Sequence, residues 1–306
     1  MRTKTCASLL LTILFAATLP SVPLFASPAP TIKRSRSDRD INAIGHRDIV
    51  HGKERPFIAS QDKEKELGAK YFAAFEHSAK LIHDPEITTY LTALAQNIER
   101  NSDAHMPITV IVVDSNTVNA CTSPGGYQYV TRGLLIYTET EGELAAVLAH
   151  GVAHTALHSP TRQQVRQALI TVATSMPATI PVFTCISQSS FPITSGVLQK
   201  DEFDADYFGV QYLYKSGYDP ECYLRFVQRI WPAGPGSNVS VAFSQFPPSV
   251  ERLKTLRNEI ADILPPREQL VVSRSAFDEF QAYLRKLPSS PPGPDQPVLL
   301  RPNTEE

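Results

Sequence analysis

Two histidines stand four residues apart in LAAVLAHGVAHTALH, the stretch from Leu144 to His158. If this stretch is a helix, His150 and His154 share one face about 6 Å apart, so both imidazoles can reach a single tetrahedral metal ion. Such a pair alone is more often two solvated or half-buried histidines than a metal site. It therefore indicates a metal centre only if the chain supplies another ligand.

A second helix-forming stretch, EFDADYFG from Glu202 to Gly209, offers the missing carboxylate. Glu202 supplies an oxygen ligand, and Asp206 lies one turn later on the same face, where it can accept a hydrogen bond from a ligating histidine. Without a cation nearby, Glu202 would be a surface carboxylate and Asp206 a mildly unfavourable neighbour of like charge. Together the two stretches predict a metal site with three protein ligands and an open fourth position.

Five segments of the chain resemble a known family, the HtpX-like and CAAX-prenyl-endopeptidase zinc metallopeptidases, and above all its soluble, exported, BepA-like branch. They occur in the family's order across about residues 60 to 256, and a combined match of this kind is not expected by chance. The segments are PGGYQYVTRGLL, ELAAVLAHGVAH, EFDADYFG, GYDP and FSQFPPSVERL.

The resemblance implies a zincin-like α+β domain that is mostly helical with a small sheet. It also implies that His150, His154 and Glu202 bind one zinc ion, with Asp206 supporting the site from behind the ligands. In such enzymes zinc lowers the pKa of a bound water toward about 7. A glutamate directly after the first histidine takes the proton of that water and later passes it to the leaving amine.

Two positions depart from the family pattern. Gly151 stands where the family has the general-base glutamate, and Phe246 stands where it has the histidine of a THP segment. General acid–base catalysis contributes roughly 10² to 10⁴ in rate, so the resemblance predicts an inactive or very weak endopeptidase. Glu143 lies about 10 Å before the first histidine along a helix axis, and Glu141 and Glu139 are farther still, so none of them is placed to act instead.

The presence of Gly151 has two explanations. Glycine inside a helix costs about 1 kcal/mol relative to alanine, so helix stability does not account for it. The residue is either a natural loss of the base or an engineered or misread position in an active enzyme. The second departure, at Phe246, favours natural loss.

Three functional hypotheses follow. The leading one is an exported homologue that binds zinc, lacks catalysis, and holds unfolded envelope proteins as peptide substrates or clients. The second is an active zinc metalloendopeptidase in envelope protein quality control, and the third is a metal-free structural or protein-binding module. Metal content separates the third hypothesis from the others, and chelator-sensitive hydrolysis separates the first from the second.

Residues 1–26 are typical of a secretory signal peptide. Arg2 and Lys4 form a positive start, the stretch from Ala7 to Leu19 is an apolar core, and Ala26 offers a small residue for cleavage. The apolar stretch is short for a membrane span. The sequence therefore predicts export, to the periplasm or to the exterior.

The composition is that of a globular protein, with 42% hydrophobic and 20% charged residues in 306. Removing the two basic residues of the signal from 29 leaves 27 against 31 acidic residues, which argues against a nucleic-acid partner. Cys121, Cys185 and Cys222 then remain. This odd number allows at most one internal disulfide, and the pairing is open.

The predicted organisation is a disordered linker at 27–56, a zincin-like domain at 57–260, and a C-terminal helix with a proline-rich tail at 261–306. Five helices are expected from apolar spacing and caps, with the first beginning after Ser60. They cover residues 63–81, 85–100, 139–158, 201–216 and 275–287.

Two strands are expected, at 106–115 and directly after the Gly-Gly turn that follows Pro124. A strand with Tyr127 and Tyr129 is more often simple sheet core, and the alternative is an edge strand near the metal that could hold an extended peptide by strand addition. His158 is interpreted as a surface residue. The apolar stretch from Ala168 to Phe183, broken by prolines, leaves open a lid or a hairpin in peripheral contact with a membrane.

Overall fold

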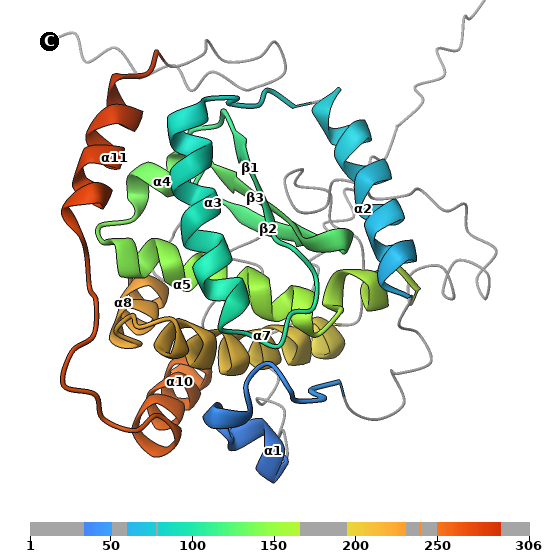
Figure 1. Ribbon diagram of the computed structural model, residues 1–306, viewed down its shortest axis with the longest axis vertical. Helices are drawn as coiled ribbons and strands as arrows, with labels where there is room; N and C mark the ends of the chain where they lie inside the picture. Colours follow the sequence, from blue (N-terminus) through green and yellow to red (C-terminus); the bar gives the residue numbers. More distant parts are fainter. Residues whose placement is uncertain are drawn as a thin grey trace, which may run out of the picture.

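The computed structural model describes residues 34–50, 60–77, 79–165, 195–230, 239 and 250–288. These residues form a mostly helical α+β domain with a small three-stranded sheet, a zincin-like fold (Figure 1). The predicted fold class is confirmed. Within the described ranges, no helix combines the length and apolar character needed to cross a membrane.

The expected helices are present, although several boundaries differ. The α-helices are α1 (Arg36–Arg39), α2 (Gln61–Glu76), α3 (Pro85–Arg100), α4 (Arg132–Tyr137), α5 (Glu141–Ala156), α7 (Ser195–Lys215), α8 (Glu221–Ile230), α10 (Val250–Ile263) and α11 (Ser275–Lys286). Helix α3 shows why prediction succeeded there. Asp84 caps its first turn through the amides of Glu86 and Ile87, and Pro85 occupies the first helical position.

The sheet contains β1 (Thr109–Val113), β2 (Ala120–Ser123) and β3 (Tyr127–Thr131) in the order β1-β3-β2. β3 runs parallel to β1 and antiparallel to β2. The Gly-Gly turn joins β2 to β3, and both glycines have φ near +80°. The strand carrying Tyr127 and Tyr129 is therefore the central strand, which agrees with the interpretation as sheet core, and the alternative of an edge strand was wrong. The edge beside it is β2.

Helix α5 lies between the sheet and α7 (Figure 1). Thr140 caps its start by accepting a hydrogen bond from the Glu143 amide. Apolar residues surround most of the helix, so it is buried almost throughout and cannot shift without disturbing the core. Gly209 lets α7 approach closely, because a Cβ at that position would lie 3.1 Å from the Cα of His150.

Residues 34–50 differ from the expected linker. They include α1, and Ile41, Ile44 and Ile49 are buried in the main core. The guanidinium of Arg47 donates to the carboxylate of Asp103, and both side chains are fully buried. The segment has little regular structure of its own. Its order comes from contacts with distant residues, which local composition does not reveal.

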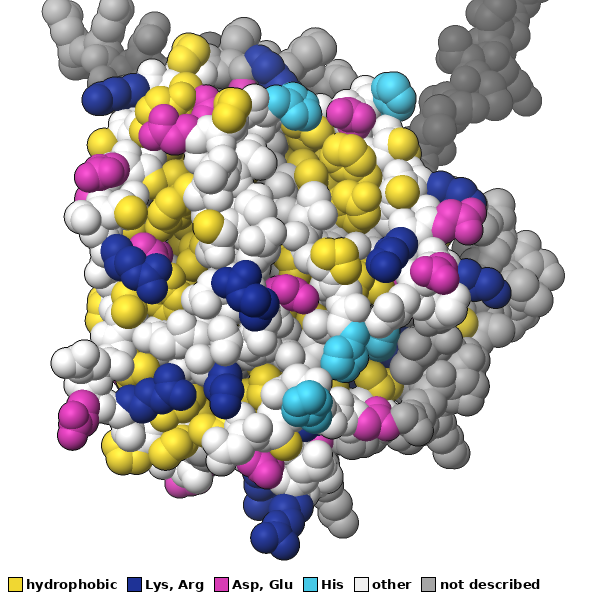
Figure 2. All heavy atoms as spheres, viewed as in Figure 1, with side chains coloured by type: hydrophobic (Ala, Val, Ile, Leu, Met, Phe, Trp, Pro, Cys, Tyr) yellow, Lys and Arg dark blue, Asp and Glu magenta, His cyan; other side chains and the backbone are white. Residues whose placement is uncertain are grey.

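The predicted boundary at residue 260 falls inside α10 and does not divide the described fold. Phe277, Phe280 and Leu284 of α11 belong to the same core as α3 and α5. The proline-rich tail, the stretch from Ala168 to Phe183, Cys185 and Phe246 lie outside the described residues. On the face shown in Figure 2, basic and acidic side chains are interspersed, in keeping with a formal net charge of −2.

Candidate metal centre

The three predicted ligands come together at the contact between α5 and α7. The Nε2 atoms of His150 and His154 are 3.0 Å apart, and each lies 3.4 Å from a carboxylate oxygen of Glu202. Bonds of about 2.1 Å at tetrahedral angles would place ligand atoms about 3.4 Å from one another. Two imidazoles and a carboxylate at these separations fit a small divalent ion, and all three side chains are half-buried.

Asp206 and Tyr223 lie behind His150. The hydroxyl of Tyr223 donates to Asp206 Oδ1 at 2.7 Å and lies 2.6 Å from Nδ1 of His150, while Asp206 Oδ1 is 3.2 Å from the same nitrogen. Since the phenolic proton goes to Asp206, the tyrosine oxygen must accept from an Nδ1–H of His150. That tautomer leaves Nε2 free to bind a metal. Asp206 therefore lies where it was expected, and Tyr223, on α8, was not anticipated.

Arg252 of α10 supplies the positive charge between the two carboxylates. Its guanidinium donates to both oxygens of Asp206, with Nη2 2.7 Å from Oδ1, and Nη2 also lies 3.5 Å from Glu202 Oε2. The sequence indicated that this pair of like charges needs a cation nearby. Arg252 belongs to the FSQFPPSVERL segment of the family resemblance, but its contact with Asp206 was not anticipated.

The electrostatics of the cluster favour two carboxylates and a charged imidazole in the absence of a metal. Burial alone would raise the pKa of Asp206, but the charge and hydrogen bonds of Arg252 lower it to about 2. The two histidines likewise outweigh burial and hold the pKa of Glu202 well below its ordinary value. Burial opposes a charge on His150, yet hydrogen bonds that its ring donates to Asp206 and Glu202 raise its pKa to about 9.

Gly151 faces the sheet, and no side chain could be added there without movement. A Cβ at this position would lie 2.8 Å from Cδ and Nε2 of Gln128 and 2.9 Å from Oγ1 of Thr122. Gln128 is 3% exposed and donates from Nε2 to the carbonyl of Leu148 at 3.3 Å. Close packing therefore supplies a reason for glycine that helix propensity does not.

The acidic residues at the start of α5 have other partners. Glu143 accepts from the backbone amide of Glu139 and from Arg229, and Glu139 also pairs with Arg229. Glu141 accepts from Tyr218 and from Arg274. The expectation that these carboxylates stand apart from the histidine pair agrees with these contacts.

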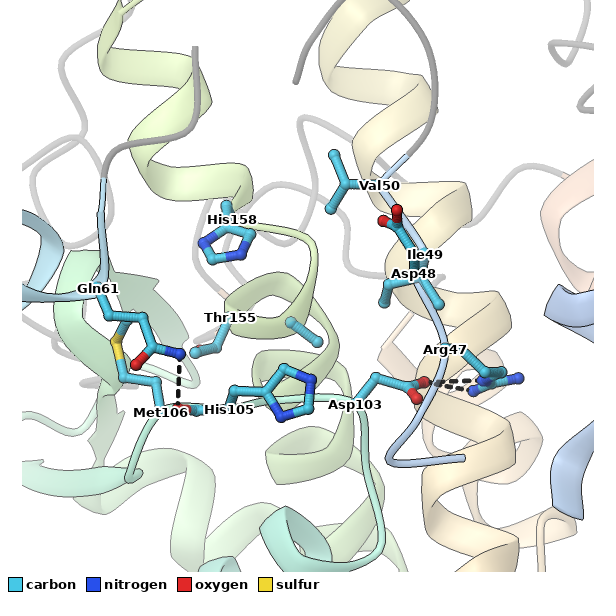
Figure 3. Close-up of a pocket in the computed structure, with 11 residues that line it drawn as sticks. Arg47, Asp48, Ile49, Val50, Gln61, Asp103, His105, Met106, Thr155 and His158 are labelled. Atoms are coloured by element: carbon cyan, nitrogen blue, oxygen red, sulfur yellow. Dashed lines mark hydrogen bonds and ion pairs between the residues drawn. The ribbon is translucent and has the colours of Figure 1, made fainter. Parts of the chain in front are cut away.

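His158 is not the surface residue that was expected. It adopts a positive φ of 53° just beyond α5, and its half-buried ring lies 2.9 Å from the buried carboxylate of Glu64. It lines a pocket of about 100 Å³ beyond the C-terminal end of α5 (Figure 3). Arg47, Asp103 and His105 also line this pocket, which includes none of the three predicted ligands.

The sequence matches the family model described as Peptidase family M48, a family of metallopeptidases, over residues 82–260. The beta-barrel assembly-enhancing protease of Yersinia pestis is 29% identical over 185 residues, which cover 56% of this chain and 38% of the relative. The protein of the same name from Escherichia coli strain K12 is 25% identical over 248 residues, covering 74% of this chain and 48% of the relative.

A third relative is the mitochondrial metalloendopeptidase OMA1 of Schizosaccharomyces pombe, which is 29% identical over 163 residues. These residues cover 51% of this chain and 48% of the relative, so the chain spans less than half the length of each of the three. The family match covers more than half of the chain and includes His150, His154 and Glu202, and this chain belongs to peptidase family M48.

Proposed function

We propose that this chain is an exported M48 protein, periplasmic or secreted, that binds one zinc ion and holds unfolded envelope proteins with little or no endopeptidase activity. The observation that carries the proposal is the pairing of two features on adjacent residues of α5. His150 completes a set of three ligand atoms within 4.8 Å of one another, while Gly151 offers no side chain beside it.

Zinc is the ion that suits this donor set. Two imidazole nitrogens and one carboxylate oxygen are the ligands of many catalytic zinc sites, and when bound there zinc acts as a Lewis acid toward a carbonyl group. His150, His154 and Glu202 would hold the ion, and Asp206 with Tyr223 would fix the ring of His150. No fourth protein ligand is present among the described residues, which leaves one side for a client.

Weak or absent hydrolysis follows from the groups beside the site. Neither the amide of Gln128 nor the hydroxyl of Thr122 is a base at neutral pH, so neither can take a proton from water. Glu143 and Glu141 are held by Arg229 and Arg274. Losing the general base removes roughly 10² to 10⁴ in rate.

An extended peptide is the client that the sheet suits best. In the part of the chain that the structure describes, β2 is an edge strand; it packs against α5, and its four residues are all half-buried. Edge strands bind extended segments by adding a strand to the sheet. Two relatives are named for the assembly of β-barrels, and unfolded β-rich envelope proteins would present segments of this kind.

The test is zinc content and casein hydrolysis by the purified mature chain. We expect one zinc per chain, its loss in His154→Ala and in Glu202→Gln, and no casein hydrolysis above the rate with chelator. His158→Ala is the matched control, because this histidine lies just beyond α5 and outside the cluster, so it should keep its zinc. A chain without zinc would favour the metal-free module, and chelator-sensitive hydrolysis would favour the working endopeptidase.

A further inference from the structure

The space beside Gly151 is closed by two residues on neighbouring strands. Thr122 of β2 and Gln128 of β3 are directly paired in the antiparallel register, so their side chains stand on the same face of the sheet. That face is turned toward α5, because both side chains reach Gly151. The two strands thus place two polar side chains against Gly151 on α5.

Both side chains bind the backbone of α5. Gln128 donates to the carbonyl of Leu148, and Thr122 lies at the limit of a hydrogen bond, 3.5 Å, from the carbonyl of Gly151. Gln128 is almost fully buried. A buried amide is costly unless it is hydrogen-bonded, so this contact holds the side chain in place.

Gln128 and Thr122 occupy the space into which any side chain at residue 151 would extend. Contacts below 3.0 Å to a Cβ are not seen in folded proteins, and Gln128 and Thr122 would both make them. The end of Gln128 could swing aside, but it would then lose its bond to Leu148. A glutamate at residue 151 therefore competes directly with Gln128 for the same buried space.

We infer that Gln128 and Thr122 together fill the space that a general-base glutamate at residue 151 would occupy, without supplying a base. We call this pair of side chains the plug. Gly151 and the plug are then one adapted unit that keeps a bound client uncleaved. This role deepens the proposed function and rests on it for catalysis, whereas the packing of the three residues does not depend on zinc or on hydrolysis. The plug also favours a natural glycine at 151 over a misread glutamate, because a side chain there would displace Gln128 from its hydrogen bond to Leu148.

The packing is tested by thermal unfolding of the metal-free protein in chelator. In an open helix, Gly→Ala raises Tm by roughly 2 to 4 °C for a domain of this size. We expect Gly151→Ala to lower Tm in the natural background and to raise it in a Gln128→Ala/Thr122→Ala background. Comparing Gly151→Ala within each background cancels the loss caused by removing the plug itself.

The control background is Gln281→Ala. Gln281 is also buried and donates to backbone carbonyls, those of Leu135 and Thr138, but it lies on α11. Gly151→Ala should lower Tm there as in the natural chain. An equal rise of Tm in all three backgrounds would overturn the plug.

The catalytic part is tested by casein hydrolysis with zinc. We expect Gly151→Glu alone to stay within about tenfold of the natural chain, and Gly151→Glu combined with Gln128→Ala/Thr122→Ala to gain roughly 10² to 10⁴ in rate. The catalytic part of the inference would be overturned if Gly151→Glu alone hydrolysed casein as fast as the combined variant. It would also be overturned if the combined variant held zinc but hydrolysed casein no faster than the natural chain. Absence of zinc from every variant would instead count against the proposed function and leave the Tm comparison standing.

Discussion

Arg252 and His150 face the carboxylates of Glu202 and Asp206, and with a proton on His150 the four groups carry two charges of each sign. The sequence indicated the two acids and the histidine, because i,i+4 spacing places side chains on one helix face. It did not indicate that Tyr223 stands between His150 and Asp206. A metal entering this cluster must displace the proton on His150, so metal binding and protonation are coupled.

This coupling predicts the pH dependence of the metal-free protein. His150 has a folded pKa of about 9 against an ordinary value of 6.5, so its proton stabilises the folded chain. That stabilisation is complete below pH 6.5 and is lost as the pH rises through about 9. In chelator we expect Tm to fall over this range. We also expect the rise in Tm caused by zinc to grow over this range, because the proton that competes with zinc for His150 leaves.

Thermal unfolding of the natural chain and of His150→Gln, at several pH values, measures this effect. The variant lacks the titrating group and should lose most of the fall in Tm between pH 6.5 and 9. Identical pH profiles for the two chains in chelator would show that His150 does not carry the raised pKa.

At the scale of elements, the site depends on the separation of two helices. α5 contributes His150 and His154, α7 contributes Glu202, and Gly209 sets how closely α7 approaches α5. Bonds to zinc tolerate only about 0.2 Å of change. A shift of the helices by a few tenths of an ångström therefore reaches the metal ligands without altering any of them.

Gly209→Ala should weaken zinc binding through this shift. Its Cβ would lie 3.1 Å from the Cα of His150 and 3.3 Å from the carbonyl of Ala149, so α7 must move outward. Substitutions that disturb the support of zinc ligands lower affinity about 10- to 100-fold, and we expect a loss of that order. Competition with a chelating dye measures it. Val210→Ala is the control, since it opens a cavity on α7 and should lower stability with little change in zinc affinity.

The elements that the sequence predicted are those with strong local signals. Ser60 caps α2 as expected, and the Gly-Gly turn after Pro124 leads into β3 as expected, whereas β2 was not predicted. Tyr223 lies on a helix with a similar start signal, because Asp219 accepts from the amide of Glu221 and Pro220 lies between them. A start signal does not reveal what a helix contacts, so the contacts of Tyr223 and Arg252 with the cluster depend on tertiary packing. The choice between a central and an edge position for the strand with Tyr127 and Tyr129 stayed open for the same reason, because strand order is not encoded in the alternation of one strand.

At the scale of the whole molecule, residues 34–50 join parts of the chain that are distant in sequence. Arg47 donates to Asp103, to the side chain of Gln211 on α7, and to the carbonyl of Asp38. The hydroxyl of Tyr212 also donates to Asp103, so every member of this buried network has a partner. Helix α7, which carries Glu202, is thereby fixed at a second place beyond its contact with α5.

Breaking this network should destabilise the entire domain. Arg47→Met leaves the carboxylate of Asp103 buried without its guanidinium, and removal of one partner of a buried ion pair costs about 3 to 5 kcal/mol. Lys70→Met is the control, because the Lys70–Glu66 pair is 69% and 65% exposed and should change stability by no more than about 0.5 kcal/mol. The free energy of unfolding in urea measures both.

A second variant separates lost pairing from lost packing. Arg47→Met combined with Asp103→Leu removes both charges, and replacing a buried ion pair with apolar residues is often neutral, so it should recover much of the stability lost by Arg47→Met. If Arg47→Met unfolds at the same urea concentration as the natural chain, residues 34–50 do not pack in solution as described. The original expectation of a solvated linker would then be correct, and α7 would be held by α5 and the C-terminal helices alone.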